Sequence, residues 1–159
     1  VEIQRFAERV TEQTQVTAFI ASDIDIPTIQ EVEDKGLDEP GMPVIDQSVA
    51  AAQASAGCAF VFTKAGLTTG VGAEAGAIPE HFRLRGPESA VRNPKTFCIL
   101  AEGEQNEAGE YGARFSSASI DEMDIAYRLR FRYFENREQL VERLIAFVDS
   151  YVVPLYGED

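Results

Sequence analysis

The chain has 159 residues, which is a typical length for one domain. Hydrophobic residues make up 45% of it and charged residues 26%, which excludes a disordered or low-complexity protein, because such chains lack the apolar residues of a core. No apolar run approaches the roughly 20 residues of a membrane helix, and no charged and then apolar leader opens the sequence. We therefore expect a soluble cytoplasmic protein that does not contact a membrane.

The charge is strongly acidic: 14 basic and 27 acidic residues give a formal net charge of −13. Eleven of the basic residues are Arg and only three are Lys, and Trp is absent. This composition is typical of adaptation to molar salt, where ions screen the repulsion between like charges. It predicts a halophilic archaeal protein, with an acidic mesophilic protein as the alternative. Both exclude direct binding to a nucleic-acid backbone, which requires clustered Lys and Arg.

The metal-ligating and nucleophilic residues are few. Cys58 and Cys98 each lie in an apolar run, which predicts buried free thiols. Together with the single His81 they cannot supply the ligands of a zinc site. No nucleophile-elbow motif accompanies His81, so catalysis by a Ser-His-Asp triad is not expected.

The first half of the chain alternates helical and strand-like patterns. We expect an amphipathic helix up to Gln13, a buried strand over 16–21, and over 28–42 a solvated loop, with a short helical turn in it as an open alternative. An Ala-rich helix, an apolar strand, a loop and a second helix follow, at 43–56, 58–63, 64–70 and 72–82.

The second half continues the alternation. A buried strand is expected over 96–101 and a short helix over 119–126, where Ser119 and Glu122 have capping-box spacing. Residues 127–134 alternate apolar side chains with Arg, which predicts a strand exposed on one face and near a sheet edge. Asn136 is expected to cap a final helix with an apolar stripe.

Strands that alternate with helices predict a parallel sheet covered on both faces. We therefore expect one α/β domain over 1–159, a three-layer α/β/α fold that is flavodoxin-like or Rossmann-like. Because the chain opens inside a helix, we expect the first strand of this fold to be missing, and the chain to be the C-terminal part of a longer one.

Ligands of open parallel sheets bind beyond the carboxyl ends of the strands, where 22–27, 63–74 and 102–104 are expected. Gly70-Val71-Gly72 followed by Gly76 is only loosely similar to a dinucleotide fingerprint, because six residues separate it from the strand and the glycine spacing is off by one. The alternative is that these glycines simply permit a tight connection. No Walker pattern is present.

Three segments carry a family resemblance. They are 19–27 (Phe-Ile-Ala-Ser-Asp-Ile-Asp-Ile-Pro), 59–62 (Ala-Phe-Val-Phe) and 70–76 (Gly-Val-Gly-Ala-Glu-Ala-Gly). In these, the chain resembles an uncharacterised haloarchaeal group of α/β proteins. The run 58–76, an apolar strand, a short loop and then Gly-Val-Gly-Ala-Glu-Ala-Gly, looks like the segment of nucleoside 2-deoxyribosyltransferases and related Toll/interleukin-receptor-like domains of that general fold, in which a helix-borne Glu follows the strand and loop. The resemblance covers most of the chain in the order of elements, although about 25 residues carry it.

The resemblance implies that Glu74 acts at the anomeric carbon of a nucleoside or dinucleotide, with NAD or a nucleoside as substrate and no certain cofactor. A carboxylate there stabilises the positive charge that develops on the sugar. The pocket would be lined by Asp23, Asp25, Thr69, Gly70 and Gly72.

The chain departs from those enzymes at two places. The upstream strand and loop are absent, and Thr68-Thr69 replaces the Asp-rich stretch that precedes the Glu. Glu74 has the alternative role of an acid near a helix N-terminus. Asp23 and Asp25 are alternatively turn-forming acids, and a Mg²⁺ site on this pair is conceivable, although we assign no metal.

The sequence thus predicts a domain that binds a nucleotide or nucleoside and cleaves or transfers at an N-glycosidic bond. The alternative is a non-catalytic assembly or regulatory protein that keeps the fold, as a homo-oligomer or within a larger assembly.

The acidic surface predicts a dependence on salt. We expect the melting temperature to rise between about 0.1 and about 3 M KCl, because screening reduces repulsion among the carboxylates. Calorimetry across this range checks it, and an unchanged melting temperature would contradict the halophilic interpretation.

Overall fold

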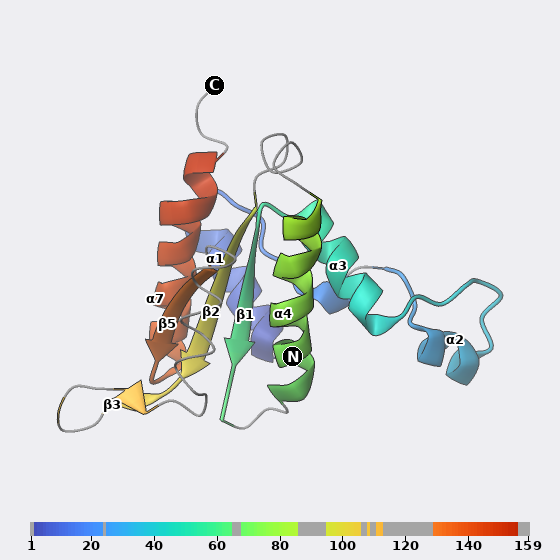
Figure 1. Ribbon diagram of the computed structural model, residues 1–159, viewed down its shortest axis with the longest axis horizontal. Helices are drawn as coiled ribbons and strands as arrows, with labels where there is room; N and C mark the ends of the chain where they lie inside the picture. The colour runs from blue at the N-terminus through green and yellow to red at the C-terminus, as the bar shows by residue number, and fades with distance from the viewer. Residues whose placement is uncertain are drawn as a thin grey trace.

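The computed structural model describes residues 2–23, 25–64, 68–85, 95–105, 108, 111–112 and 129–155 (Figure 1). Its helices are α1 (Glu2–Gln13), α2 (Ile29–Lys35), α3 (Val44–Ala54), α4 (Thr68–Leu84) and α7 (Arg137–Phe147). Its strands are β1 (Gly57–Phe62), β2 (Thr96–Glu102), β3 (Glu104–Gln105), β4 (Tyr111–Gly112) and β5 (Leu129–Phe134). Short helical turns are η1 (Ala21–Asp23), η2 (Val148–Val152) and η3 (Val153–Leu155).

The main sheet has the order β1-β2-β5, and both pairs of strands are parallel. The register aligns Cys58 with Phe97 and Phe97 with Leu129. The central strand β2 is buried along nearly its whole length, as expected of a strand covered on both faces. β5 lies at one edge with Arg130 and Arg132 exposed, which confirms the edge strand predicted from the alternation.

Helices cover both faces of this sheet, which confirms the three-layer α/β/α arrangement (Figure 1). On one face, side chains of α3 and α4 pack on Phe60, Phe97 and Ile99. On the other face, side chains of α1, α7 and η2 pack on Cys98 and Leu100. The alternation of side chains along each strand divides the core into these two clusters.

The first helix is held to the last one. The Arg9 guanidinium donates to both carboxylate oxygens of Glu138, at 3.2 and 2.9 Å. This bidentate pair raises the pKa of Arg9 and lowers the pKa of Glu138. It links α1 to α7, and Val10 of α1 is buried in the core cluster on this face of the sheet.

Side chains satisfy backbone groups at the ends of two helices. The Asn136 side chain accepts from the amide of Gln139 at 3.0 Å, which confirms the predicted cap of the last helix. The Lys95 ammonium donates to the carbonyls of Gln53 and Ser55 at the end of α3, where a cation complements the helix dipole.

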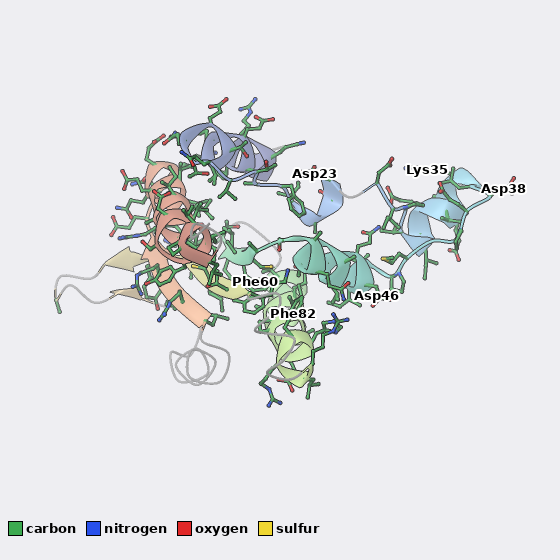
Figure 2. The ribbon with its side chains drawn as sticks, turned by 90° about the horizontal axis from the view of Figure 1, so that it is seen from above. Asp23, Lys35, Asp38, Asp46, Phe60 and Phe82 are labelled. Atoms are coloured by element: carbon green, nitrogen blue, oxygen red, sulfur yellow. The ribbon has the colours of Figure 1, made fainter. Side chains whose placement is uncertain are left out.

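Residues 25–43 form an arm that projects from the body, with Lys35 and Asp38 at its far end (Figure 2). Its helix α2 has a complete capping box between Thr28 and Glu31, which the sequence analysis missed. None of the residues of α2 is buried. The arm is therefore stabilised by local hydrogen bonds, and it has no buried core of its own.

The predicted strand over 16–21 is wrong, since the described sheet contains no such strand. The segment is extended, but its amides bond to nearby side chains and not to β1; Val16 donates to the Thr14 hydroxyl at 3.2 Å, for example. The predicted start of the second helix at Gly72 is also wrong, because α4 already begins at Thr68.

Some expectations fall outside the described residues, namely the helix over 119–126, the start of the strand over 127–134, and part of the loop over 64–70. Within the described part of the chain, no helix combines the length and apolar character that a membrane span requires.

Replacing Leu100 tests the central strand. Leu100 is fully buried, so we expect Leu100→Ala to lower the free energy of unfolding by about 3 kcal/mol through lost burial and a residual cavity. Leu84 is 71% exposed, so Leu84→Ala should change it by less than about 0.5 kcal/mol. Urea denaturation at constant KCl measures both, and equal losses would contradict the assigned core.

Candidate functional site

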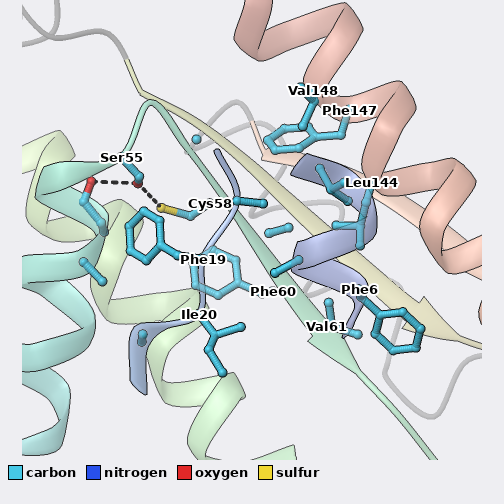
Figure 3. A pocket seen from close by; sticks show the side chains of 18 of the residues that line it. Phe6, Phe19, Ile20, Ser55, Cys58, Phe60, Val61, Leu144, Phe147 and Val148 are labelled. Atoms are coloured by element: carbon cyan, nitrogen blue, oxygen red, sulfur yellow. Dashed lines mark hydrogen bonds between the residues drawn. The ribbon is translucent and has the colours of Figure 1, made fainter. Parts of the chain in front are cut away.

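A cavity of about 720 Å³ lies along the outer edge of β1 (Figure 3). Its walls come from α1 and α7 on one side of the sheet, from α3 and α4 on the other, and from the segment 16–22 opposite β1. Most of the lining is apolar, with Phe19 and Phe60 among the larger side chains. A cavity of this size and character is typical of small-molecule sites.

Among the described residues, Glu74 is the one carboxylate in this lining. Its Oε1 accepts from the Ser48 hydroxyl at 2.6 Å, and Ser48 itself is only 5% exposed. Ser48 also lies 3.3 Å from the carbonyl of Val44, one turn earlier in α3. The contact fixes one carboxylate oxygen, while Oε2 has no hydrogen-bond partner among the described residues.

The Cys58 thiol and the Ser55 hydroxyl form a second polar group in the cavity lining. The Cys58 Sγ lies 3.4 Å from the Ser55 Oγ, which also donates to the carbonyl of Ala52 (Figure 3). Burial raises the pKa of the Cys58 thiol, and it raises the pKa of Cys98 to about 12. Both cysteines are free, so the predicted buried thiols are confirmed for Cys98 and only partly for half-buried Cys58. Neither is an activated nucleophile, since a raised pKa disfavours the thiolate.

Among the predicted site residues whose burial the structure describes, Glu74 lines the cavity, whereas Asp23, Asp25 and Gly72 do not. Asp23 accepts from the amide of Ile20 at 3.0 Å and from the Gln4 side chain at 3.4 Å, so it holds a turn. Asp25 is exposed outside the lining.

The glycine-rich run does not form a loop around a ligand, because Thr69, Gly70 and Gly72 all lie in the first turns of α4. A Cβ added at Gly72 would meet nothing within 4 Å, so no close approach requires that glycine. The side chain of Thr69 lies outside the described residues.

The cavity follows the edge of β1 between Gly57 and Val61, and it reaches Val71 and Glu74 in the first turns of α4. At the carboxyl ends of the strands, Glu102 of β2 accepts from the backbone amide of Lys64 at 2.6 Å. The three strands of the main sheet lie side by side in their chain order, although β3 and β4 intervene in the sequence, so the described sheet has no reversal of strand order, where ligands of open α/β sheets usually bind.

No three metal-ligating side chains come together in the described ranges of the chain. A magnesium site on Asp23 and Asp25 therefore has no further ligand there, and Asp23 is already engaged with Ile20 and Gln4.

Sequence reasoning missed Ser48, the polar partner of Glu74. A signal was present, because Ser48 precedes the apolar run Val49-Ala50-Ala51-Ala52 in a helix expected to pack on the sheet. A lone hydroxyl on such a face needs a hydrogen-bond partner.

Comparison with known proteins identifies a family. Residues 2–154 match the model described as "Domain of unknown function (DUF7509)", and the chain belongs to that family. Neither the curated proteins nor the solved structures contain a significant match.

Proposed function

We propose that this DUF7509 domain binds a nucleoside, or the nucleoside part of a nucleotide, in the cavity beside β1, and that Glu74 acts at its N-glycosidic bond. The observation that carries the proposal is a single carboxylate, held by a buried hydroxyl, in an otherwise mostly apolar cavity. Such a site suits a ligand with a flat apolar part and a few hydrogen-bond donors.

The two parts of a nucleoside match different parts of the lining. The aromatic rings of Phe19 and Phe60 suit the flat faces of a base, since aromatic rings pack favourably in offset or edge-to-face geometry. The free Oε2 of Glu74 accepts a hydrogen bond from a sugar hydroxyl. The carboxylate then lies next to the sugar, where positive charge develops as the glycosidic bond breaks.

The reaction needs little else from the chain. Attack of a Glu74 oxygen on the anomeric carbon forms a sugar ester, and the bond to the base nitrogen breaks with its electron pair leaving on the base. The base of a nucleoside takes a proton from water, whereas nicotinamide leaves NAD as a neutral molecule and needs none. A further water or an acceptor base then attacks the anomeric carbon, and the sugar-ester bond breaks to free the Glu74 carboxylate. Ser48 keeps the carboxylate oriented throughout, through its 2.6 Å hydrogen bond.

Glu74→Gln tests the proposal, because it keeps the size and removes the charge. We expect the intact protein in molar KCl to release base from NAD or from one of a set of nucleosides, and the variant to be at least roughly 100-fold slower. Chromatography of the released base measures this.

The matched control is Glu80→Gln, on the same helix but outside the cavity lining, which should keep full activity. Equilibrium dialysis with labelled adenosine measures binding separately. Binding without release would overturn the catalytic step, and an intact protein that neither binds nor cleaves any nucleoside would overturn the whole proposal.

The projecting arm favours a second candidate, an assembly function. Large apolar side chains lie exposed along the arm and at the start of α3, namely those of Ile29, Leu37, Val44 and Ile45. Val44 is 63% exposed, and exposed apolar side chains that group together are typical of protein-protein interfaces. The arm would then contact another copy of the chain or a larger assembly.

Val44→Glu tests this candidate, because it places a charge on the exposed apolar surface without disturbing the core. If the arm mediates assembly, sedimentation in molar KCl should show an oligomer for the intact protein and a monomer for the variant. Leu84→Glu is the control, since Leu84 is equally apolar and exposed but distant from the arm in the sequence. A monomeric intact protein would exclude self-assembly.

A further inference from the structure

The segment Thr14–Ser22, which we name the strap, is extended over Thr17–Ile20, between a bend at Thr14–Val16 and the turn η1, and no described strand pairs with it. Its burial alternates strictly from Thr14 to Ile20, with even-numbered residues half-buried and odd-numbered ones exposed. Val16 and Ala18 pack against the core cluster on the side of α1 and α7. This alternation is the signature of an extended strand with one covered face.

One edge of the strap is satisfied by side chains. The amides of Val16, Ala18 and Ile20 donate to Thr14, Thr11 and Asp23, at 3.2, 2.9 and 3.0 Å. In an extended chain, successive residues direct their backbone groups to opposite edges. The groups of Thr17 and Phe19 therefore face the other edge, and among the described residues they have no hydrogen-bond partner.

The outer edge of β1 is open in the same way. The amide of Thr96 donates to the carbonyl of Ala56, so Ala56 and every second residue after it face β2. Gly57, Ala59 and Val61 then direct their backbone groups away from β2, and none has a partner in the described part of the chain. Ala59 is exposed although it lies in the middle of the strand.

These two open edges line the same cavity. Figure 3 shows the strap running from the level of Cys58 down to Ile20, in the same sense as the β1 arrow. The cavity also lies between the two helical layers, since α1 and α7 line one side and α3 and α4 the other. This is the position that a fourth parallel strand occupies in a three-layer fold.

We propose that the strap closes onto β1 as a fourth parallel strand, and that this closed state and an occupied cavity exclude one another. Closure pairs the free groups of Thr17 and Phe19 with those of Gly57, Ala59 and Val61, and it covers the Phe19 side chain, which is 40% exposed in the open state. Only the identity of the ligand rests on the proposed function. The closure itself rests on the two open edges.

A disulfide pair tests the closure. In a background of Cys58→Ala and Cys98→Ala, the pair Ala18→Cys and Ala59→Cys places both thiols on the face toward α1 and α7, where paired strands bring them within disulfide reach. The control pair, Thr17→Cys and Ala59→Cys, places them on opposite faces. We expect a disulfide in the first pair and none in the control. No disulfide in the first pair, or equal yields in both, would overturn closure.

Amide hydrogen exchange provides a test on the unmodified protein, which removes any doubt about folding of the variants. In the closed state the amides of Thr17, Phe19, Ala59 and Val61 are hydrogen-bonded, so we expect their exchange to be at least tenfold slower than that of unpaired amides. Exchange of all four at the unprotected rate would overturn closure.

The exclusion is tested with Nile red, an uncharged apolar dye that needs no knowledge of the natural ligand. We expect its fluorescence with the first pair to be lost on oxidation and restored on reduction, whereas the control pair should not respond. Equal fluorescence in both redox states would overturn the exclusion. Adenosine binding to the intact protein decides the proposed function separately, so the two can fail independently.

Discussion

The one-sided hydrogen bonding of β1 is the constraint on which the candidate site depends. β1 pairs with β2 along its length, while its outer edge presents Gly57, Ala59 and Val61 to a cavity and to no described strand. Unpaired backbone groups at a sheet edge are costly to leave buried in an apolar space. The strap does not relieve this in the open state, because Thr11, Thr14 and Asp23 satisfy only its far edge. Because no described strand pairs with the outer edge of β1, a cavity lies there. The unpaired backbone groups of the same edge favour whatever fills the cavity and bonds to them.

The second feature of the site is a carboxylate in apolar surroundings. A carboxylate loses solvation in such a place, and a hydrogen bond to the charged form offsets part of that loss. Ser48 provides that bond from α3, so the position of Glu74 depends on the packing of α3 against α4. The position of Glu74 in the cavity wall is thus coupled to the geometry of this helical layer.

The charged residues of the chain affect its surface and not its core. The described ion pairs lie at the surface, and the Arg9–Glu138 pair links α1 to α7 without entering the interior. The arm collects acidic residues around exposed apolar ones and has no buried residue in α2. Salt weakens the repulsion among such carboxylates by screening. It strengthens apolar contacts only where its ions are excluded from the protein surface. The net charge of −13 therefore bears on the solvent conditions and partners of the domain more than on its fold.

The sequence by itself determined the elements whose cause is local. Periodicity predicted α1, the strands β1 and β2 to within one residue at each end, the one-sided edge strand β5, and the cap at Asn136, because side-chain alternation and capping depend on neighbours in the chain. Whether Val16–Ala21 pairs with β1 was decided by the tertiary structure, because a paired strand and an unpaired extended segment have the same apolar pattern in the sequence. The tertiary structure also decided that Glu74 meets Ser48, 26 residues away, whereas Asp23 turns to Ile20. A hydrogen bond between distant residues depends on how the layers pack, and no local pattern contains that information.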